Sequence, residues 1–312
     1  MAYLKQIHRT LVSNRLIALL CIVLIFLGRI FAGATFYQYI TWLVFVIQLG
    51  IIFLLLRINY VHRIIVKKTV LPVVFFLLLT ASYPSLYNNL EGNISAFLFV
   101  LCLALTLKNY HNPKSQPDSF NIALILTLGS MLIWRPLLFF IPLFWIGFYR
   151  FRALNGKSFA ASLLGIFIVY LFLSAWCLHI NDWSLFFNNL PQFDKTFNIR
   201  WIEIRWYDWV LDGFLLFLLI MTATQIFASG ISEKIKTISF FKYLYIIIVV
   251  LFVLAIFFDQ AVYNIQCIIY IPVAFIIGYY FTMLDNNKWV TYLFLFTILL
   301  FIGNYIYRVY SL

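Results

Sequence analysis

Residues 158–180 read SFAASLLGIFIVYLFLSAWCLHI, a run without lysine, arginine, aspartate or glutamate. About 20 apolar residues in a helix cross the hydrocarbon core of a bilayer, and comparable runs recur along the chain. They predict an all-α polytopic transmembrane helix bundle of about eleven spans: nine full spans plus a short helix pair. The runs are 16–36, 39–56, 70–86, 94–107, 121–134, 137–148, 158–180, 209–228, 243–258, 265–284 and 289–307.

The composition is that of a membrane protein. Of the 312 residues, 65% are hydrophobic and 10% are charged, whereas a soluble domain carries about 25% charged residues. The net charge of +12 comes from lysine and arginine in short segments between apolar runs, a distribution that orients membrane helices. No basic stretch is typical of a nucleic-acid groove, so we expect no nucleic-acid partner.

The basic residues predict the orientation. With the N-terminus in the cytoplasm, sixteen of the 22 lysine and arginine residues fall on the cytoplasmic side, and seven of the ten acidic residues fall outside. This bias follows the positive-inside rule. The first run is too long for the apolar core of a signal peptide and has no small-residue cleavage site, which predicts a retained anchor. We therefore expect a multi-pass protein of the cell inner membrane, with one integral domain over 1–312.

Two alternatives remain for 121–148. Trp134, Arg135 and Pro136 join its two short apolar runs, and Pro136 disfavours helical geometry at Arg135. The pair is either two thin spans or a re-entrant hairpin, and both return the chain to the cytoplasm. A hairpin would mark the bundle interior, because broken backbone at membrane depth needs protein or a water-filled cavity around it.

Ionisable residues near the external side are the first functional candidates. Arg29 lies about 10 Å inside the end of its run, so it either faces a polar cavity or marks a helix that ends early. Arg135 is placed to bind a phosphate or carboxylate, or a lipid headgroup. The turn at 83–93 reads YPSLYNNLEGN. Its Asn88, Asn89 and Glu91 are suited to sugar hydroxyls or a phosphate-linked headgroup, or form an ordinary turn with helix-capping residues.

The stretch 181–208 is rich in aromatic residues and is predicted to be an external loop lying on the membrane. It also carries the densest group of charges in the chain, at Arg200, Glu203, Arg205 and Asp208. Asp208 and Asp212 would share one helical face. The loop is either a structural lid or a lid over a lipid-linked substrate, and Asp208 and Glu91 are the candidates for a catalytic carboxyl group.

Several chemistries have no signature. The four histidines are scattered and the four cysteines lie in apolar runs without a CxxC pair, so we expect no metal. A disulfide between Cys177 and Cys267, near the external ends of their spans, stays open. The absence of GxSxG, P-loop and GxGxxG motifs predicts no nucleotide cofactor.

Residues 88–173 carry NLEGN (89–93), LGSMLIWRPLLFFIPLFW (128–145) and FRALNGKSFAASLLG (151–165). In these motifs the chain resembles a family of uncharacterised multi-pass inner-membrane proteins from Bacteroidota, which brings no assigned activity. More broadly it resembles membrane-embedded polyprenyl-phosphate-sugar-dependent glycosyltransferases, with about eleven spans, short helix pairs and an external membrane-lying loop. That resemblance implies an acidic catalytic residue in the first external loop, but residues 32–38 contain none, so Glu91 would have to replace it.

Two functional hypotheses follow. The first is a non-catalytic scaffold or transport protein that handles a membrane lipid or lipid-linked sugar in a cavity open to the outer leaflet, lined by Arg29, Arg135 and aromatic residues. The second is a glycosyltransferase-like enzyme with Glu91 or Asp208 in that cavity. A pure assembly partner of another membrane protein is a third option, and it predicts no cavity.

Overall fold

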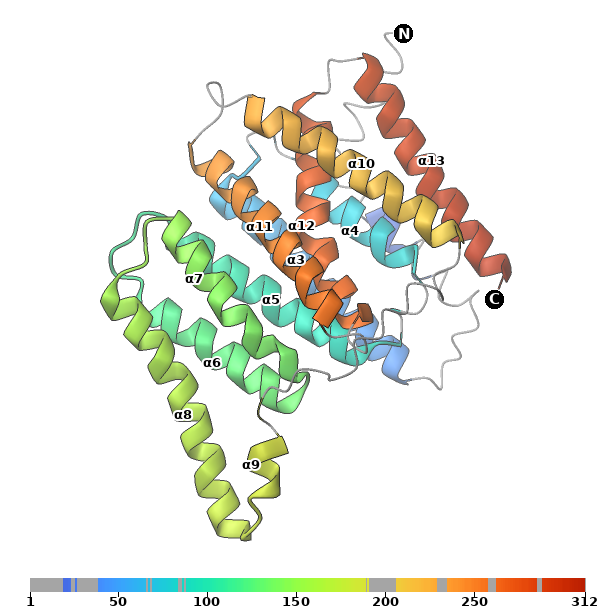
Figure 1. Cartoon of the computed structure of the whole chain (residues 1–312). Coiled ribbons are helices and arrows are strands. Elements are labelled where there is room, and N and C mark those ends of the chain that lie inside the picture. Colours follow the sequence, from blue (N-terminus) through green and yellow to red (C-terminus); the bar gives the residue numbers. More distant parts are fainter. Residues whose placement is uncertain are drawn as a thin grey trace. The chain divides into compact units, whose positions relative to one another are not determined.

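The structure is a computed structural model that describes residues 19–23, 26, 39–65, 67, 69–83, 86, 88–188, 190, 206–228, 235–257, 262–284 and 288–311. All regular secondary structure in these residues is helical, which confirms the all-α prediction for them. The elements in Figure 1 are α3 (Tyr39–His62), α4 (Leu71–Ala81), α5 (Leu90–Lys108), α6 (Gln116–Leu132), the 3-10 helix η2 (Arg135–Phe140), α7 (Ile141–Arg150), α8 (Gly156–Ile180), α9 (Ser184–Asn188), α10 (Trp206–Ala228), α11 (Ile235–Phe257), α12 (Val262–Met283) and α13 (Lys288–Ser311).

Among the described residues, seven helices are long and apolar enough to cross a membrane: α3, α5, α8, α10, α11, α12 and α13. The prediction of transmembrane helices is confirmed at this level. The run 16–36 lies mostly outside the described residues, of which 19–23 and 26 are helical. Each of the other ten predicted runs coincides with helical residues.

The helix α4 differs from the span expected over 70–86. It has 11 residues, which corresponds to about 16 Å and is too short to cross a bilayer alone. The helix ends where Ser82 Oγ donates to the Leu78 carbonyl, shortly before Pro84, which disfavours helical geometry in the residue before it. Ten of its residues are buried, so protein rather than lipid surrounds this short element.

The described helices fall into two compact units. Unit 1 comprises residues 1–90, 198–248 and 269–312, and unit 2 comprises 91–197 and 249–268. Helices α11 and α12 contribute residues to both units. The single integral domain expected over 1–312 stays a prediction.

One end of unit 1 gathers basic segments that are far apart in the sequence. Thr237 Oγ1 donates to the Ile64 carbonyl at 3.1 Å, and Lys67 Nζ donates to the Thr282 carbonyl at 3.3 Å. The second bond places a cation at the C-terminal end of α12, where it stabilises the helix dipole. The loop after α3 and the start of α11 therefore lie at the same end of unit 1.

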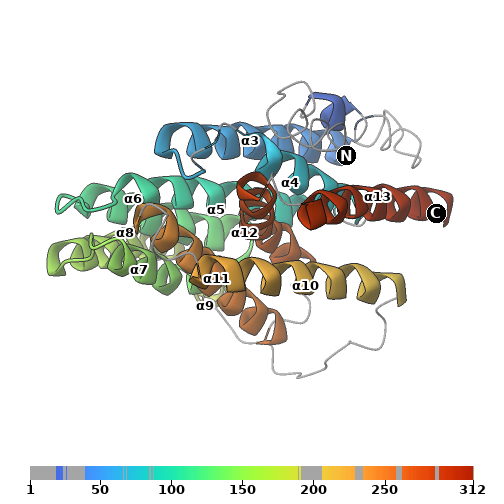
Figure 2. The same cartoon turned by 90° about the horizontal axis from the view of Figure 1, so that it is seen from above.

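The core of unit 1 is built around α4, which contacts α3 and α13 (Figure 2). The Phe75 ring lies 5.6 Å from that of Phe281 and 6.3 Å from that of Phe294, measured between centroids. Gly278 of α12 packs directly on Pro72 in the first turn of α4: a Cβ on this glycine would lie 2.8 Å from the Pro72 nitrogen. Proline has no N–H, so this close approach leaves no donor of Pro72 without a partner.

In unit 2, helices α6 and α8 pack closely through small residues. A Cβ on Gly165 would lie 2.8 Å from the Phe120 carbonyl oxygen and 3.1 Å from the Ala123 Cβ. Ser119 Oγ donates to the Ser158 carbonyl at 2.7 Å. Small residues that let two backbones approach, with a hydroxyl bond across the interface, are typical of helix pairs in membranes.

The structure shows the geometry of the hinge at 121–148. Trp134 has an extended backbone with φ −152° and ψ 110°, and the chain then turns into η2 with proline in its first turn. Helix α6 is about 26 Å long, and η2 with α7 covers about 27 Å. The His111 amide donates to the Phe151 carbonyl at 2.9 Å, so the turn before α6 and the turn after α7 lie side by side.

Candidate functional site

The other end of unit 1 brings the turn after α4 to the start of α10. Tyr83 Oη donates to Asp212 Oδ1 at 2.7 Å. The Tyr83 side chain is 5% exposed and its ring lies 5.7 Å from the ring of Tyr270 on α12. Asp212 is exposed. A buried tyrosine, held between helices, thus fixes one oxygen of a surface carboxylate.

Each partner is placed by its own element. Helix α4 ends at Ala81, so Tyr83 follows immediately after its last turn. Helix α10 starts at Trp206, which puts Asp212 about 9 Å into a largely apolar helix. A charge at such a position costs free energy in a membrane, by about 2.5–3.5 kcal/mol at the helix centre. The hydrogen bond from Tyr83 offsets part of that cost.

A second polar contact lies in the same turn. Thr41 Oγ1 of α3 donates to Asn88 Oδ1 at 2.6 Å, and Asn88 is exposed. Its side-chain nitrogen is a hydrogen-bond donor. Asn89, the next residue, is half-buried. Of the residues predicted in the 83–93 turn, Asn88 and Asn89 therefore belong to unit 1 with Asp212.

Glu91 and Arg135 belong to unit 2. Glu91 is exposed in the first turn of α5, where a carboxylate stabilises the helix N-terminus. Arg135 is exposed at the start of η2, and its carbonyl accepts a hydrogen bond from Ser130 Oγ at 2.7 Å. The structure does not place either residue relative to Asp212, because the two units are separate bodies.

Four predicted residues, Arg29, Arg200, Glu203 and Arg205, lie outside the described residues. Asp208 lies in the described helix α10, one turn before Asp212, and its side chain is outside what the structure describes. Helical geometry places residues four apart on one face. Asp208 and Asp212 therefore share a face of α10, as the sequence predicted.

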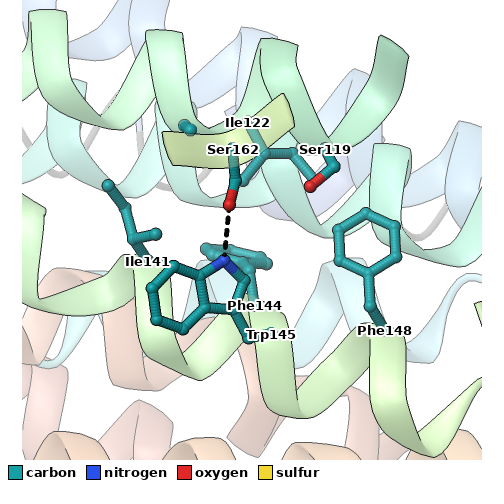
Figure 3. Close-up of a pocket in the computed structure, with 8 residues that line it drawn as sticks. Ser119, Ile122, Ile141, Phe144, Trp145, Phe148 and Ser162 are labelled. Atoms are coloured by element: carbon teal, nitrogen blue, oxygen red, sulfur yellow. Dashed lines mark hydrogen bonds between the residues drawn. The ribbon is translucent and has the colours of Figure 1, made fainter. Parts of the chain in front are cut away.

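The expected cavity lined by Arg29 and Arg135 stays a prediction, because Arg29 lies outside the described residues. A hollow in unit 2 is lined by Ser119, Ile122, Ala123, Ile141, Phe144, Trp145, Phe148 and Ser162. Figure 3 shows the Trp145 indole across this hollow, donating through Nε1 to Ser162 Oγ at 2.9 Å. The hollow has no room for a water molecule, so it is a packing defect rather than a binding site.

Two residues of the site were missed by the sequence analysis. Tyr270 lies inside an apolar run and Thr41 near the start of another, and neither is marked by spacing or charge. Asp212 has a detectable signal, because an acidic residue inside an apolar helix is costly and therefore informative. In the described part of the chain, no group of three or more histidine, cysteine or acidic residues could hold a metal. Cys177 and Cys267 are free thiols, so the disulfide left open above is not formed.

No family model, curated protein or solved structure matches the chain. The geometry of the site therefore carries the functional assignment.

Proposed function

We propose that this chain is a non-catalytic inner-membrane protein that holds the polar headgroup of a lipid-linked sugar, or of another lipid of the envelope, at the external end of unit 1. The observation that carries the proposal is the hydrogen bond from buried Tyr83 to the exposed carboxylate of Asp212. One carboxylate oxygen is fixed by the protein, and Asp212 is exposed at the surface.

The chemistry of the site favours a headgroup rich in hydroxyl groups. An ionised carboxylate only accepts hydrogen bonds, and the exposed amide of Asn88 supplies a donor. A carboxylate repels a phosphate placed directly against it, because both groups carry negative charge. Sugar hydroxyls suit this set of groups, and the phosphate of a lipid-linked sugar would need Arg200 or Arg205 of the neighbouring loop.

The proposed topology has about eleven spans, with the N-terminus in the cytoplasm, and it counts the short α4 as a crossing that is surrounded by protein rather than lipid. Lys67 and Thr237 lie at one end of unit 1, whereas Asp212 lies near the opposite end of α10 from its junction with α11. The positive-inside rule assigns the basic end to the cytoplasm. In this topology α6 is one thin span and η2 with α7 is another, because each is close to the roughly 30 Å of a hydrocarbon core.

The alternative is a glycosyltransferase-like enzyme with Asp208 or Glu91 as the catalytic acid or base. The pairing of Asp208 with Asp212 on one face of α10 favours Asp208 over Glu91, since Glu91 is exposed and has a helix-stabilising role. Arg29, Glu203 and Arg135 stay proposed contributors to ligand binding in either reading.

The test is native mass spectrometry of the full chain purified in mild detergent, with lipids from the host membrane. Asp212→Asn keeps an acceptor for Tyr83 but removes the charge, so we expect retention of a sugar-bearing lipid to fall by about 10–100-fold, the value of a hydrogen bond to a charged group. Asp182→Asn is the matched control. Hydrogen bonds from the Ser184 side chain and amide lower the pKa of Asp182, so this control also loses a carboxylate that is charged at neutral pH.

Equal lipid retention in Asp212→Asn and the unaltered chain would contradict the proposal. If the bound lipid instead loses its sugar on incubation, and Asp208→Asn stops that loss, the enzyme reading replaces the non-catalytic one.

A further inference from the structure

One end of unit 2 presents exposed charge of a single sign. Here α5 and α7 end and α6 and α8 begin, and five exposed cations line the surface: Lys108, Lys114, Arg150, Arg152 and Lys157. We name this surface the basic cap. The single acidic residue of the described cap is Asp118, whose side chain is 8% exposed and accepts from Lys108 Nζ at 3.1 Å and Asn109 Nδ2 at 2.9 Å. The acid is therefore screened, and the accessible charge is positive.

The backbone under the basic cap is tightly held. The turn at 109–115 is tied to the turn at 151–155 by hydrogen bonds from the His111 amide to the Phe151 carbonyl, from Ser115 Oγ to the Ala153 carbonyl and from Asn155 Nδ2 to the Pro113 carbonyl, at 2.9, 2.6 and 2.9 Å. Phe151 and Ala153 are buried. The cations thus project from a fixed surface, which lowers the entropy cost of binding an anion to several of them together.

Two of these cations, Arg152 and Lys157, occupy positions at which their residue type is unfavourable for the local backbone or helix. Arg152 has a φ of 55°, in the left-handed region where a side chain costs about 1–2 kcal/mol relative to glycine. Lys157 lies in the first turn of α8, which contains no acidic residue, and a cation there opposes the helix dipole. Helix stability does not explain either residue, in contrast to Lys108 and Arg150 in the last turns of their helices.

We propose that the basic cap binds the phosphate headgroup of an anionic phospholipid in the leaflet on its side of the membrane. The surface continues from charge into apolar side chains: Leu164 follows Lys157 by two helical turns on the same face of α8, and it is 55% exposed. A lipid with its phosphate at Arg152 and Lys157 would lay its acyl chains along this face. A soluble anion or a nucleic acid would contact the cations but would leave the exposed apolar face of α8 uncovered. The basic cap lies in unit 2 and does not depend on the function proposed for Asp212.

The experiment titrates the full chain in detergent with phosphatidylglycerol, and separately with phosphatidylcholine of the same acyl chains, and follows bound lipid by native mass spectrometry. Each cation near a charged lipid surface contributes about a five-fold gain in binding. We expect Arg152→Gly to weaken phosphatidylglycerol binding about five-fold, and Arg152→Gly with Lys157→Gln to weaken it on the order of 30-fold. Phosphatidylcholine binding should be unchanged.

The glycine variant separates binding from folding. Because glycine relieves the strained backbone at this position, the melting temperature of Arg152→Gly should be unchanged or higher while lipid binding falls. His111→Gly is the matched control, since His111 also has a positive φ, of 56°. This substitution keeps the hydrogen bond from the backbone amide of residue 111 to the Phe151 carbonyl, and it removes no permanent charge. Arg57→Gln, at an exposed site on α3 in unit 1, controls for the loss of net charge.

Weaker phosphatidylglycerol binding in Arg152→Gly alone among these three single variants supports the proposal. It is overturned if Arg152→Gly binds phosphatidylglycerol as the unaltered chain does, if either control loses as much, or if phosphatidylcholine binds equally well.

Discussion

Replacing Gly278 by alanine should loosen unit 1, although alanine is the better helix former. The new Cβ would lie 2.8 Å from the nitrogen of Pro72 and 2.9 Å from its Cγ and Cδ, whereas ordinary contact begins at 3.4 Å. The two elements must therefore separate by about 0.6 Å. The proline ring cannot rotate away, and α4 is buried at ten of its 11 residues, so the strain spreads into the Phe75 and Phe281 contact.

The size of the effect follows from a matched substitution. In Gly303→Ala, on α13, no described atom lies within 4 Å of the new Cβ, so this variant gains the helix propensity of alanine, about 1 kcal/mol. Gly278→Ala gains the same amount and adds the cost of overpacking, about 1–3 kcal/mol. The propensity gain cancels in the comparison, so the difference between the two variants measures the clash alone.

The assay is thermal unfolding of both variants and the unaltered chain in the same detergent. At about 2 °C per kcal/mol for a chain of this size, Gly278→Ala should melt about 2–6 °C below Gly303→Ala. The reasoning is refuted if the two variants melt together, because the close packing of α12 on α4 would then be absent or freely adjustable.

Two further predictions concern orientation and a buried polar cluster. In intact cells, a membrane-impermeant thiol reagent should modify Arg135→Cys and spare Arg63→Cys, because the proposed topology places the hinge outside and the loop after α3 in the cytoplasm; the reverse pattern would contradict that topology. Asp118→Ala should lower stability by about 1–3 kcal/mol, because fully buried Asn109 loses an acceptor. Lys108→Gln should cost less than about 1 kcal/mol because its side chain is 63% exposed, and equal melting temperatures for these two variants would count against the cluster as drawn.

The hinge at 134–136 and the helix α4 show which features the sequence patterns predicted and which they did not. Pro136 marked the hinge, but the extended residue is Trp134, two positions before the proline, and Arg135, where non-helical geometry was expected, is the first residue of η2. The length of α4 was predicted less well, because residues 70–86 are apolar almost throughout. The helix ends where Ser82 bonds back to the Leu78 carbonyl, and hydropathy does not register such a bond.

For the candidate site, the sequence identified individual residues but not which of them lie together. Asn88, Glu91 and Asp208 were named from the sequence, because polar groups next to apolar runs are conspicuous. Their grouping was not: Glu91 falls in unit 2 and Asn88 in unit 1. The bond between Tyr83 and Asp212 joins residues 129 positions apart, and no local pattern encodes such a pairing.

By itself the sequence determined that the described residues form apolar helices, since hydropathy acts locally along the chain. Only the tertiary structure decided which face of each helix meets protein. In a membrane the lipid-facing and the protein-facing sides of a helix are both apolar, because lipid tails are as apolar as packed side chains. Leu164 is exposed and Leu173 is buried on the one helix α8. The same helix contacts α6 at Gly165, which lies against Phe120 and Ala123, and this pairing of residues about 40 positions apart is set by the tertiary structure.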